Sequence, residues 1–503
     1  MIQPTAESLT GQPVRRIVIA GGGTAGWMAA AAISKVLGKV LDITLVESDE
    51  IGTVGVGEAT IPPLVTFHRL LEINEQEFMA ATQGAIKLGI SFENWLDVGH
   101  RYFHSFGTTG RDHWTAGFQH FWLKGRERGL ASDYSDYNVE SCAAREGKFA
   151  HLPNMGMNYA FHFDASLYGK FMRRLAEGNG VKRVEGKIAQ VSLDDESGFI
   201  QSLRLESGEV IEGDLFIDCT GFRALLIHKA LNVGFEDWSH WLFNDSALAC
   251  QTTAVRDAAP YTSAIAEEAG WQWRIPLQHR VGNGIVYSSR YMSDDRAREI
   301  FEASLEGEVI AKPWPIRFRP GRRLKSWHKN CVALGLAGSF IEPLESTTIH
   351  LIQRGITRLM QNFPQAVSQV AIDEYNQQMG DELVHVRDFV VLHYALTHRR
   401  DTDYWRACNA MELPATLQHR IDLFRETGTV FHQPNELFAE NSWIQVMMGQ
   451  GVVPRHHHPS ADLMGDDELS HFLNGVRGQV ERTVRPLPSH QAYLARYCPG
   501  VRA

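Results

Sequence analysis

The chain has 503 residues, of which 44% are hydrophobic and 21% are charged, a composition typical of a folded, enzyme-sized globular protein. This composition excludes an intrinsically disordered, collagen-like or coiled-coil protein. Acidic residues outnumber basic ones by 59 to 49, which gives a formal net charge of −10. Because no stretch gathers basic residues into a phosphate-binding stripe, we expect no nucleic acid partner.

The cysteines and the hydrophobic runs indicate where the chain resides. Its six cysteines stand singly and lack the paired spacing of zinc sites or disulfide frameworks, which favours a reducing cytoplasm. Residues 1–13 show no basic region followed by an apolar core, so they predict a loose arm and not a secretory signal. No apolar run approaches the roughly 20 residues that cross a bilayer, and we expect no membrane partner.

A βαβ unit is predicted at the start of the ordered chain. The apolar run 17–20 is typical of a buried parallel strand, and a glycine-rich turn and an alanine-rich helix follow it. A second apolar strand, 43–46, ends at Glu47, about 20 residues beyond the last glycine. A glycine turn alone also serves packing, but the complete unit predicts a dinucleotide site, and analogy favours FAD over NAD. Its predicted cofactor-binding residues are Gly21, Gly23, Thr24, Ala25, Gly26 and Glu47.

The rest of the chain divides into a β-rich part and a helical part. Short strands and turns alternate over 180–221, and 214–221 resembles the strand that returns to the first unit in flavoprotein monooxygenases. Beyond Thr348, apolar residues at spacings of three and four predict long helices. The histidine run 456–458 predicts a solvated turn, and we expect no metal site.

These patterns predict an α/β fold. We expect a doubly wound βαβ module of the flavoprotein monooxygenase type with an added β-sheet, and a C-terminal helical layer that binds substrate. The expected domains are the arm 1–13, an FAD-binding and substrate module over 14–347, and a mainly helical module over 348–503. Because no linker separates the last two, we expect them to pack together.

The segment 270–276, GWQWRIP, links this fold to a specific chemistry. Trp271 and Trp273 stand two apart in a predicted strand, so their side chains share one face, and Pro276 ends the pairing. A tryptophan pair alone is usually a core feature. Beside the N-terminal glycine turn, however, the motif resembles the flavin-dependent tryptophan halogenase family, and further matches extend from Ile17 to about Val453.

The resemblance implies the two catalytic residues. Lys87 in the segment GAIK matches the family's essential lysine, although a lysine on a helix is ordinarily a solvated charge. Such a group holds hypohalous acid by a hydrogen bond, or forms a haloamine if desolvation lowers its pKa. Glu345 matches the carboxylate paired with this lysine, which orients hypohalous acid or takes the proton from the ring.

The segment 338–348 leads into a predicted helix. By itself it is a helix N-terminus with hydroxyl caps, and such a terminus is also an anion site. By resemblance, the backbone at Thr347 and Thr348 holds the halide. The family commonly has glycine where this chain has Thr348, so this side chain crowds the halide.

The resemblance assigns further residues to the flavin and the substrate. The segment 56–62 looks like the family's strap along the flavin, and His104 and Phe106 match residues that flank the substrate ring. The passage between flavin and substrate keeps the ring away from the flavin, so that oxygen is not transferred directly. The residues assigned to the flavin are Gly57, Glu58, Ala59, Thr60 and Gly338, and those assigned to the passage and substrate are Trp271, Trp273, Ile275, Pro276 and Ser346.

The chain departs from the family in its lid. Tryptophan halogenases carry an insertion with paired tyrosines, an acid and a tryptophan that grips the amino acid, whereas the corresponding stretch 427–443 is short here. A zwitterion without charged partners would lose the hydrogen bonds that offset its desolvation. A neutral indole, or a larger or carrier-linked aromatic, fits better. The short lid resembles the BrvH-type branch, which halogenates free indole and favours bromide, and carbon 3 is the expected position.

The resemblance thus implies a two-component halogenase. A separate NAD(P)H-dependent flavin reductase delivers FADH2, because the chain shows no second dinucleotide fingerprint. With O2 and bromide or chloride, FADH2 gives hypohalous acid, which halogenates the ring at Lys87 with help from Glu345. Two alternatives stay open: a flavin monooxygenase that hydroxylates its aromatic substrate directly, and a non-catalytic flavin-binding protein.

Overall fold

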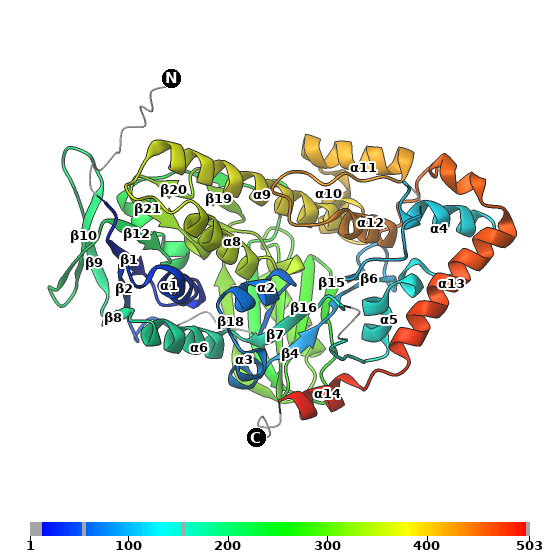
Figure 1. The fold of residues 1–503 in the computed structure, drawn as a ribbon, viewed down its shortest axis with the longest axis horizontal. Helices are drawn as coiled ribbons and strands as arrows, with labels where there is room; N and C mark the ends of the chain where they lie inside the picture. The colour runs from blue at the N-terminus through cyan, green and yellow to red at the C-terminus, as the bar shows by residue number, and fades with distance from the viewer. Residues whose placement is uncertain (1–12, 53–56, 114, 153–155, 499–503) are drawn as a thin grey trace.

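The structure is a computed structural model that describes residues 13–52, 57–113, 115–152 and 156–498. Residues 1–12 of the expected arm and Val56 of the expected strap lie outside the described residues. No helix within the described ranges has both the length and the apolar character that crossing a membrane requires. Figure 1 shows an elongated molecule with a nucleotide-type sheet at one end and α4 and α13 at the other.

A largely parallel sheet forms the first layer. The apolar run predicted as a strand pairs in parallel with a strand on each side, which buries both of its faces. Only the edge pair β20–β21 is antiparallel among the described strands of this sheet. In spatial order the strands are β20 (Trp327–His328), β21 (Cys331–Ala333), β12 (Leu215–Asp218), β1 (Arg16–Ala20), β2 (Asp42–Glu47) and β8 (Lys182–Glu185).

Different elements cover the two faces of this sheet. Ile17 and Ile19 of β1 pack against α1 (Thr24–Leu37), α6 (Ala165–Gly178) and α8 (Thr348–Gln361). Their neighbours along β1 point to the opposite face and pack beneath an antiparallel sheet of β9 (Ile188–Leu193), β10 (Ile200–Leu205) and β11 (Val210–Glu212). One face is therefore helical, and the added sheet covers the other.

A second large sheet forms the middle of the molecule. Its strands pair antiparallel except for β15 and β5, and its apolar face packs on the C-terminal helices. The predicted tryptophan strand ends at Pro276, as expected. Among the described residues the order is β18 (Val309–Arg317), β14 (Ser246–Thr253), β17 (Arg280–Tyr287), β16 (Gly270–Pro276), β15 (Thr262–Glu267), β5 (Gly89–Glu93) and β6 (Arg101–Ser105).

Small sheets connect the two layers. In the first, β7 (Ala160–Asp164) lies between β3 (Gly57–Ala59) and β4 (Ala85–Lys87), so Lys87 lies on a strand and the expectation of a helix is wrong. The cause is non-local, because β4 pairs with a strand that lies about 75 residues further along the chain. A second small sheet contains β13 (Phe235–Asp237), β19 (Gly321–Arg323) and β22 (Ser339–Phe340).

Helices form the remaining layer. Figure 1 shows α9 and α11 along the upper edge, α8 below α9, and α13 beside α4 and α5. The helices after residue 347 are α8, α9 (Gln369–Ala395), α10 (Asp403–Ala410), α11 (Ala415–Thr427), α12 (Glu440–Gly449), α13 (Asp466–Val484) and α14 (His490–Tyr497). Those before it are α1, α2 (Pro63–Leu70), α3 (Glu75–Thr82), α4 (Phe118–Glu127), α5 (Val139–Arg145), α6 and α7 (Asp294–Ser304).

Candidate active site

The turn between β1 and α1 has the geometry that a dinucleotide requires. Gly21 has a φ of +106°, and a Cβ at Gly26 would lie 1.9 Å from the Gly21 carbonyl oxygen, so both positions need glycine. At Gly23, in contrast, a Cβ would meet no described atom within 4 Å, and no described side chain caps α1. The N–H groups of the first helical turn therefore face the space that a pyrophosphate would fill.

Glu47 lies against this glycine turn at the end of β2. The Trp27 indole Nε1–H donates a hydrogen bond of 3.3 Å to Glu47 Oε2, and Arg183 Nε donates one of 2.6 Å to Oε1. Thr24 and Ala25 begin α1, and Gly335, the first residue of the turn that ends at Gly338, lies against Ala25. The residues present thus fit the adenine dinucleotide part of FAD.

The described part of the strap is β3 and the residues that follow it. Burial and the nearby charge of Asp164 raise the pKa of the Glu58 carboxyl to about 7. Ala59 and Thr60 are buried, and the Thr60 hydroxyl donates to the Phe161 carbonyl at 2.9 Å. This bond fixes the Thr60 backbone, whose carbonyl in turn accepts from Lys87.

Lys87 is completely buried at the end of β4. Its Nζ donates to the Thr60 carbonyl oxygen at 3.0 Å and to Ser346 Oγ at 2.8 Å. Burial lowers the pKa of this amine to about 7, against the opposing influence of the Glu345 charge. No ion pair joins Lys87 to any described carboxylate. Lys87 contacts Ser346, the residue that follows Glu345, and forms no direct salt bridge with Glu345.

Glu345 lies between two histidines, of which His393 was not among the predicted site residues. His104 Nδ1 lies 3.0 Å from both carboxylate oxygens of Glu345, and His393 Nε2 lies 2.9 Å from Oε1. Burial alone would raise the pKa of Glu345, but the charges and hydrogen bonds of the two histidines lower it to about 2. The carboxylate is therefore ionised throughout the physiological range.

The contacts of His393 continue beyond Glu345. Its Nδ1 lies 2.7 Å from the Tyr102 hydroxyl. Because the ionised Glu345 can only accept, Nε2 carries the proton and Nδ1 accepts from Tyr102. The resemblance to the family, which extends from Ile17 to about Val453, includes His393 but assigned it no role, so resemblance was the sequence signal that could have found it. No local pattern indicates Tyr102.

Aromatic rings surround the lysine and the carboxylate. Phe106 is half-buried beside β6, and its ring centroid lies 5.1 Å from Lys87 Nζ. On the other side, the ring of Phe438 lies 6.3 Å from that of His104 and stacks on Phe389 at 3.7 Å. His104 Nε2 is buried and has no partner among the described residues. The site thus offers aromatic walls and one free ring nitrogen.

The predicted tryptophan pair is buried in β16. The ring centroids of Trp271 and Trp273 lie 6.1 Å apart, and Ile275 and Pro276 continue the strand. Trp271 Nε1 donates to Glu342 Oε2 at 2.8 Å, which ties the strand to the turn before α8. The buried Glu342 also binds Asn244 and Tyr394, and desolvation raises the pKa of its carboxyl despite these bonds.

The predicted halide residues lie at the start of α8. Thr347 is at the N-cap position, but its hydroxyl does not cap the helix, so the capping expectation is wrong. Thr347 Oγ1 is instead buried and without a described partner, whereas Thr348 is half-buried. An unpartnered hydroxyl at a helix N-terminus fits an anion. Ser346 precedes them with a φ of +59°, which is a left-handed conformation.

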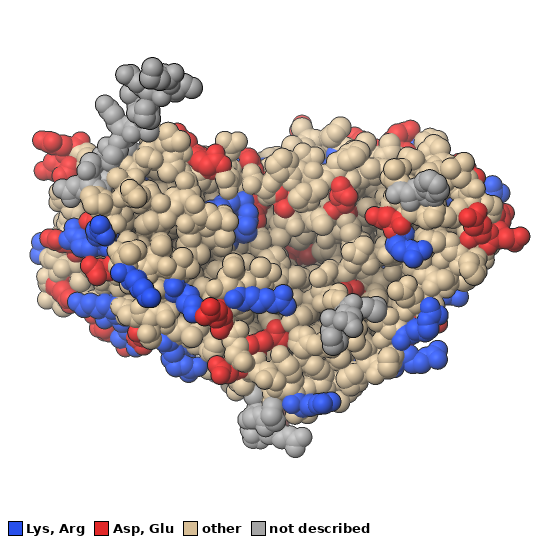
Figure 2. Space-filling model, viewed as in Figure 1, with Lys and Arg blue, Asp and Glu red and all other residues tan. Residues whose placement is uncertain are grey.

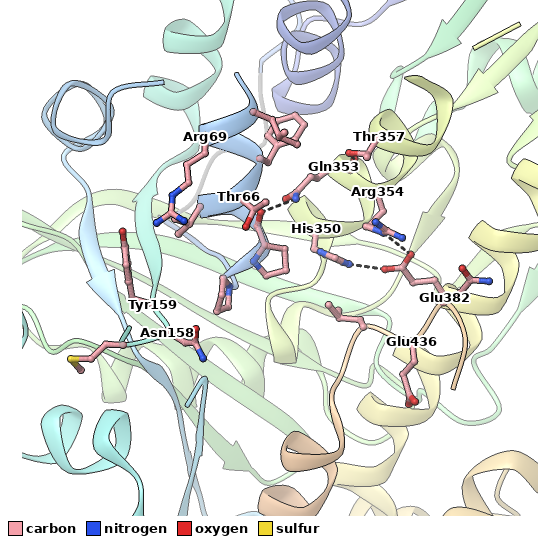
Figure 3. Close-up of a pocket in the computed structure, with 18 residues that line it drawn as sticks. Thr66, Arg69, Asn158, Tyr159, His350, Gln353, Arg354, Thr357, Glu382 and Glu436 are labelled. Atoms are coloured by element: carbon pink, nitrogen blue, oxygen red, sulfur yellow. Dashed lines mark hydrogen bonds and ion pairs between the residues drawn. The ribbon is translucent and has the colours of Figure 1, made fainter. Parts of the chain in front are cut away.

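A cleft of about 690 Å³ opens beside these residues (Figure 3). Pro62 and Pro63, which follow Thr60 closely, line it together with Asn158 and Leu437. Asn158 Nδ2 donates to the Phe106 carbonyl at 3.1 Å, so the cleft reaches the aromatic site. None of the predicted catalytic side chains lines it. The described residues contain no group of three metal ligands, and the 456–458 run lies in a loop.

Comparisons with known proteins agree with this geometry. A family model described as tryptophan halogenase matches residues 16–466. Tryptophan 7-halogenase RebH of Lentzea aerocolonigenes is 35% identical, and the alignment covers 96% of this chain and 98% of RebH. Solved structures of halogenases show the same fold.

Two of these structures are particularly similar to this chain. The flavin-dependent halogenase Xcc4156 from Xanthomonas campestris is 64% identical, with a TM-score of 0.97 over 98% of this chain and 100% of its own. BrvH, a flavin-dependent halogenase from Brevundimonas sp. BAL3, is 42% identical, with a TM-score of 0.93 over 96% and 99%.

The chain belongs to the tryptophan halogenase family. It is a flavin-dependent halogenase that uses FADH2, halide and O2 and needs a separate flavin reductase. The likeness to BrvH confirms the branch that the short lid indicated.

Proposed function

We propose that this enzyme halogenates an electron-rich aromatic ring, free indole or an indole derivative, with Lys87 and Glu345 as its catalytic residues. The buried arrangement of these two groups around Ser346, beside the ring of Phe106, carries the proposal. Reduced FAD bound at the glycine turn supplies, with O2, the oxidation of halide to hypohalous acid. All later chemistry depends on the protein's own side chains.

Lys87 has one bonding position left for hypohalous acid. As a neutral amine, Lys87 uses both N–H groups on Thr60 and Ser346 and keeps its lone pair, whereas the ammonium keeps one N–H. With a pKa of about 7, both forms are populated at neutral pH. Glu345 remains anionic and accepts the ring proton, and its two histidines disperse the charge it carries before that step.

The halide and the substrate are finer parts of the proposal. The unpartnered hydroxyl of Thr347 can donate to a halide at the α8 N-terminus, and the BrvH-type branch implies bromide in preference to chloride. The short stretch 427–443 supports an indole that lacks the zwitterionic amino acid group, and carbon 3, the most nucleophilic ring position, is the proposed site of halogenation. The six free cysteines support a reducing cytoplasm.

Product mass spectrometry tests this function. The purified protein is supplied with FAD, an unrelated flavin reductase, NADH, O2 and chloride or bromide, and indole and tryptophan compete. We expect brominated indole to exceed both chlorinated indole and halogenated tryptophan. Hydroxylated product that forms without halide would establish the monooxygenase alternative, and peroxide alone would support a non-catalytic flavin protein.

The variant Lys87→Ala separates the two stages of the reaction. Because Lys87 acts only once hypohalous acid has formed, we expect this variant to lose halogenated product while reduced flavin is still oxidised. Halogenated product at the wild-type rate from Lys87→Ala would contradict the assigned role of Lys87.

A further inference from the structure

The cleft beside the active site is much larger than an indole ring requires. Its volume of about 690 Å³ lies in the range that holds drug-sized ligands, and indole is a single bicyclic ring. Figure 2 shows this face of the molecule hollowed at its centre, with basic side chains on the left of the hollow and acidic side chains within it. This excess of space indicates a substrate that extends beyond its aromatic ring.

One face of α8 leads from the halide residues out along the cleft. His350, Arg354 and Thr357 are spaced by four and three residues and all line the cleft, so they lie on one side of the helix. Thr347 precedes His350 by three residues on the same side. A rise of 1.5 Å per residue places Arg354 about 10 Å along the helix from Thr347. A group at Arg354 therefore lies well beyond the reacting ring.

The α2 wall carries an arginine without a partner. The Arg69 guanidinium makes no ion pair or hydrogen bond with any residue that the structure describes, and its side chain is exposed. In Figure 3 it extends from α2 along the wall toward Tyr159 and Asn158. The adjacent Leu70 also lines the cleft and is 63% exposed, which leaves an apolar surface beside the charge.

The acidic residues of the cleft are already engaged. The buried Glu382 contacts His350 Nε2 at 2.7 Å and both Arg354 and Arg358, so two arginines share one carboxylate. Glu436 on the opposite wall binds Arg420 and Trp443.

Among the charged side chains that line the cleft, Arg354, Glu382 and Glu436 already have charged partners, so Arg69 is the one that no described carboxylate neutralises. Asp381 accepts a hydrogen bond of 3.4 Å from Asn435. An unpaired guanidinium attracts an anionic group.

We propose that the substrate carries its aromatic ring on a linker that ends in an anionic group, a carboxylate or a phosphate, and that Arg69 binds this group in the outer part of the cleft. This inference rests on the proposed function, because it assumes that the ring lies between Lys87 and Phe106. Arginine suits both anions, since its planar N–H groups match their paired oxygens.

Equilibrium binding to the flavin-free protein tests the proposal without any turnover. The probes are indoles that carry at carbon 5 an alkyl linker of increasing length, which ends in a carboxylate, a phosphate monoester or an uncharged primary amide. We expect one linker length at which an anion binds about fivefold to tenfold more tightly than the amide, with a smaller preference at high salt. The tighter of the two anions identifies the chemical source of the charge.

Arginine variants assign the preference to the cleft. Arg69→Gln is expected to reduce the ratio of anion to amide affinity toward one. The matched control is Arg204→Gln on β10, because Arg204 is also exposed and makes no ion pair with any described residue. We expect Arg204→Gln to keep the wild-type ratio.

Equal binding of anions and amide at every linker length would overturn the proposal, as would a preference that persists in Arg69→Gln. These outcomes are separate from the proposed function. An arginine-dependent preference supports the anion site even if no ring is halogenated, whereas halogenated indole without such a preference contradicts the anion site alone.

Discussion

Lys87 is an ionisable group that the protein holds away from water, which lowers the stability of the native state. Its Nζ bonds only to neutral oxygens, those of Thr60 and Ser346, and burial lowers its pKa from 10.5 to about 7. The unfolded chain keeps the ordinary pKa, so folding and protonation are linked. The same burial that destabilises the ammonium makes the amine reactive near neutral pH.

The pH dependence of stability reports this burial. Between about pH 7 and 10.5 the unfolded chain binds the Lys87 proton and the native state does not, so native stability rises with pH. In Lys87→Met this increase of stability with pH is absent. We expect the variant to be more stable than the wild type by a few kcal/mol at pH 7, with a difference that shrinks toward pH 10.

Urea unfolding at several pH values measures the difference between the two proteins. Lys312→Met on β18 is the control, because Lys312 is exposed, and its difference from the wild type is expected to stay constant with pH. A constant difference for Lys87→Met would show that the amine titrates normally.

Ser346 has two roles that substitutions can separate. Its backbone is left-handed, with a φ of +59°, and its hydroxyl accepts from Lys87. Ser346→Ala removes only the hydroxyl, whereas Ser346→Gly also relieves the backbone, which is worth about 1 kcal/mol. We expect both variants to lose halogenation equally and the glycine variant to be the more stable in denaturant unfolding. Recovery of activity in Ser346→Gly alone would assign the effect to the backbone.

Two elements far apart in the sequence hold Glu345 in place. His104 comes from β6 and His393 from α9, and the Tyr102 hydroxyl on β6 connects the two elements by donating to His393. Tyr102 contacts His393 and not the cleft, so it is a positioning residue. Its bond keeps the His393 proton on the nitrogen that faces Glu345.

Tyr102→Phe removes this bond without changing the ring. We expect a loss of stability of about 1–3 kcal/mol, because a buried acceptor on His393 loses its donor. We also expect kcat for halogenation to fall several-fold while KM for indole stays constant. Tyr168→Phe is the matched control, since the Tyr168 hydroxyl lies 2.9 Å from His68 in the core. A similar fall of kcat in both variants would contradict the positioning role.

Among the helices and strands, the sequence predicts some elements well and others poorly. Local periodicity and glycine spacing predicted β1, α1 and β2, because dinucleotide binding imposes short-range rules. The strand that carries Lys87 has three residues and depends on a distant partner, so no local pattern indicates it. Likewise, Tyr102 and His393 are 291 residues apart and meet only in the folded chain.

At the scale of the whole molecule, the C-terminal helix α14 helps to position Lys87. His490, the first residue of α14, is buried, and its Nε2 accepts from the backbone N–H of Ile86 in β4 at 3.1 Å. Its Nδ1 lies 2.7 Å from the Ala258 carbonyl oxygen and donates to it. Burial lowers the pKa of His490 to about 4, so the neutral ring can accept and donate at once near neutral pH. The C-terminal helix therefore fixes the strand that places Lys87.

His490→Ala leaves the buried Ile86 N–H without an acceptor. We expect a stability loss of about 1–3 kcal/mol, faster hydrogen exchange at the Ile86 amide and lower halogenation by the folded protein. Ser489→Ala is the control: the Ser489 hydroxyl caps α14 by accepting from Ala492 N–H at 3.1 Å, and its loss costs about 1 kcal/mol. Because this control keeps the bond to Ile86, its amide protection and turnover should stay near wild type. Unchanged Ile86 exchange in His490→Ala would show that β4 is held by its pairing with β7 alone.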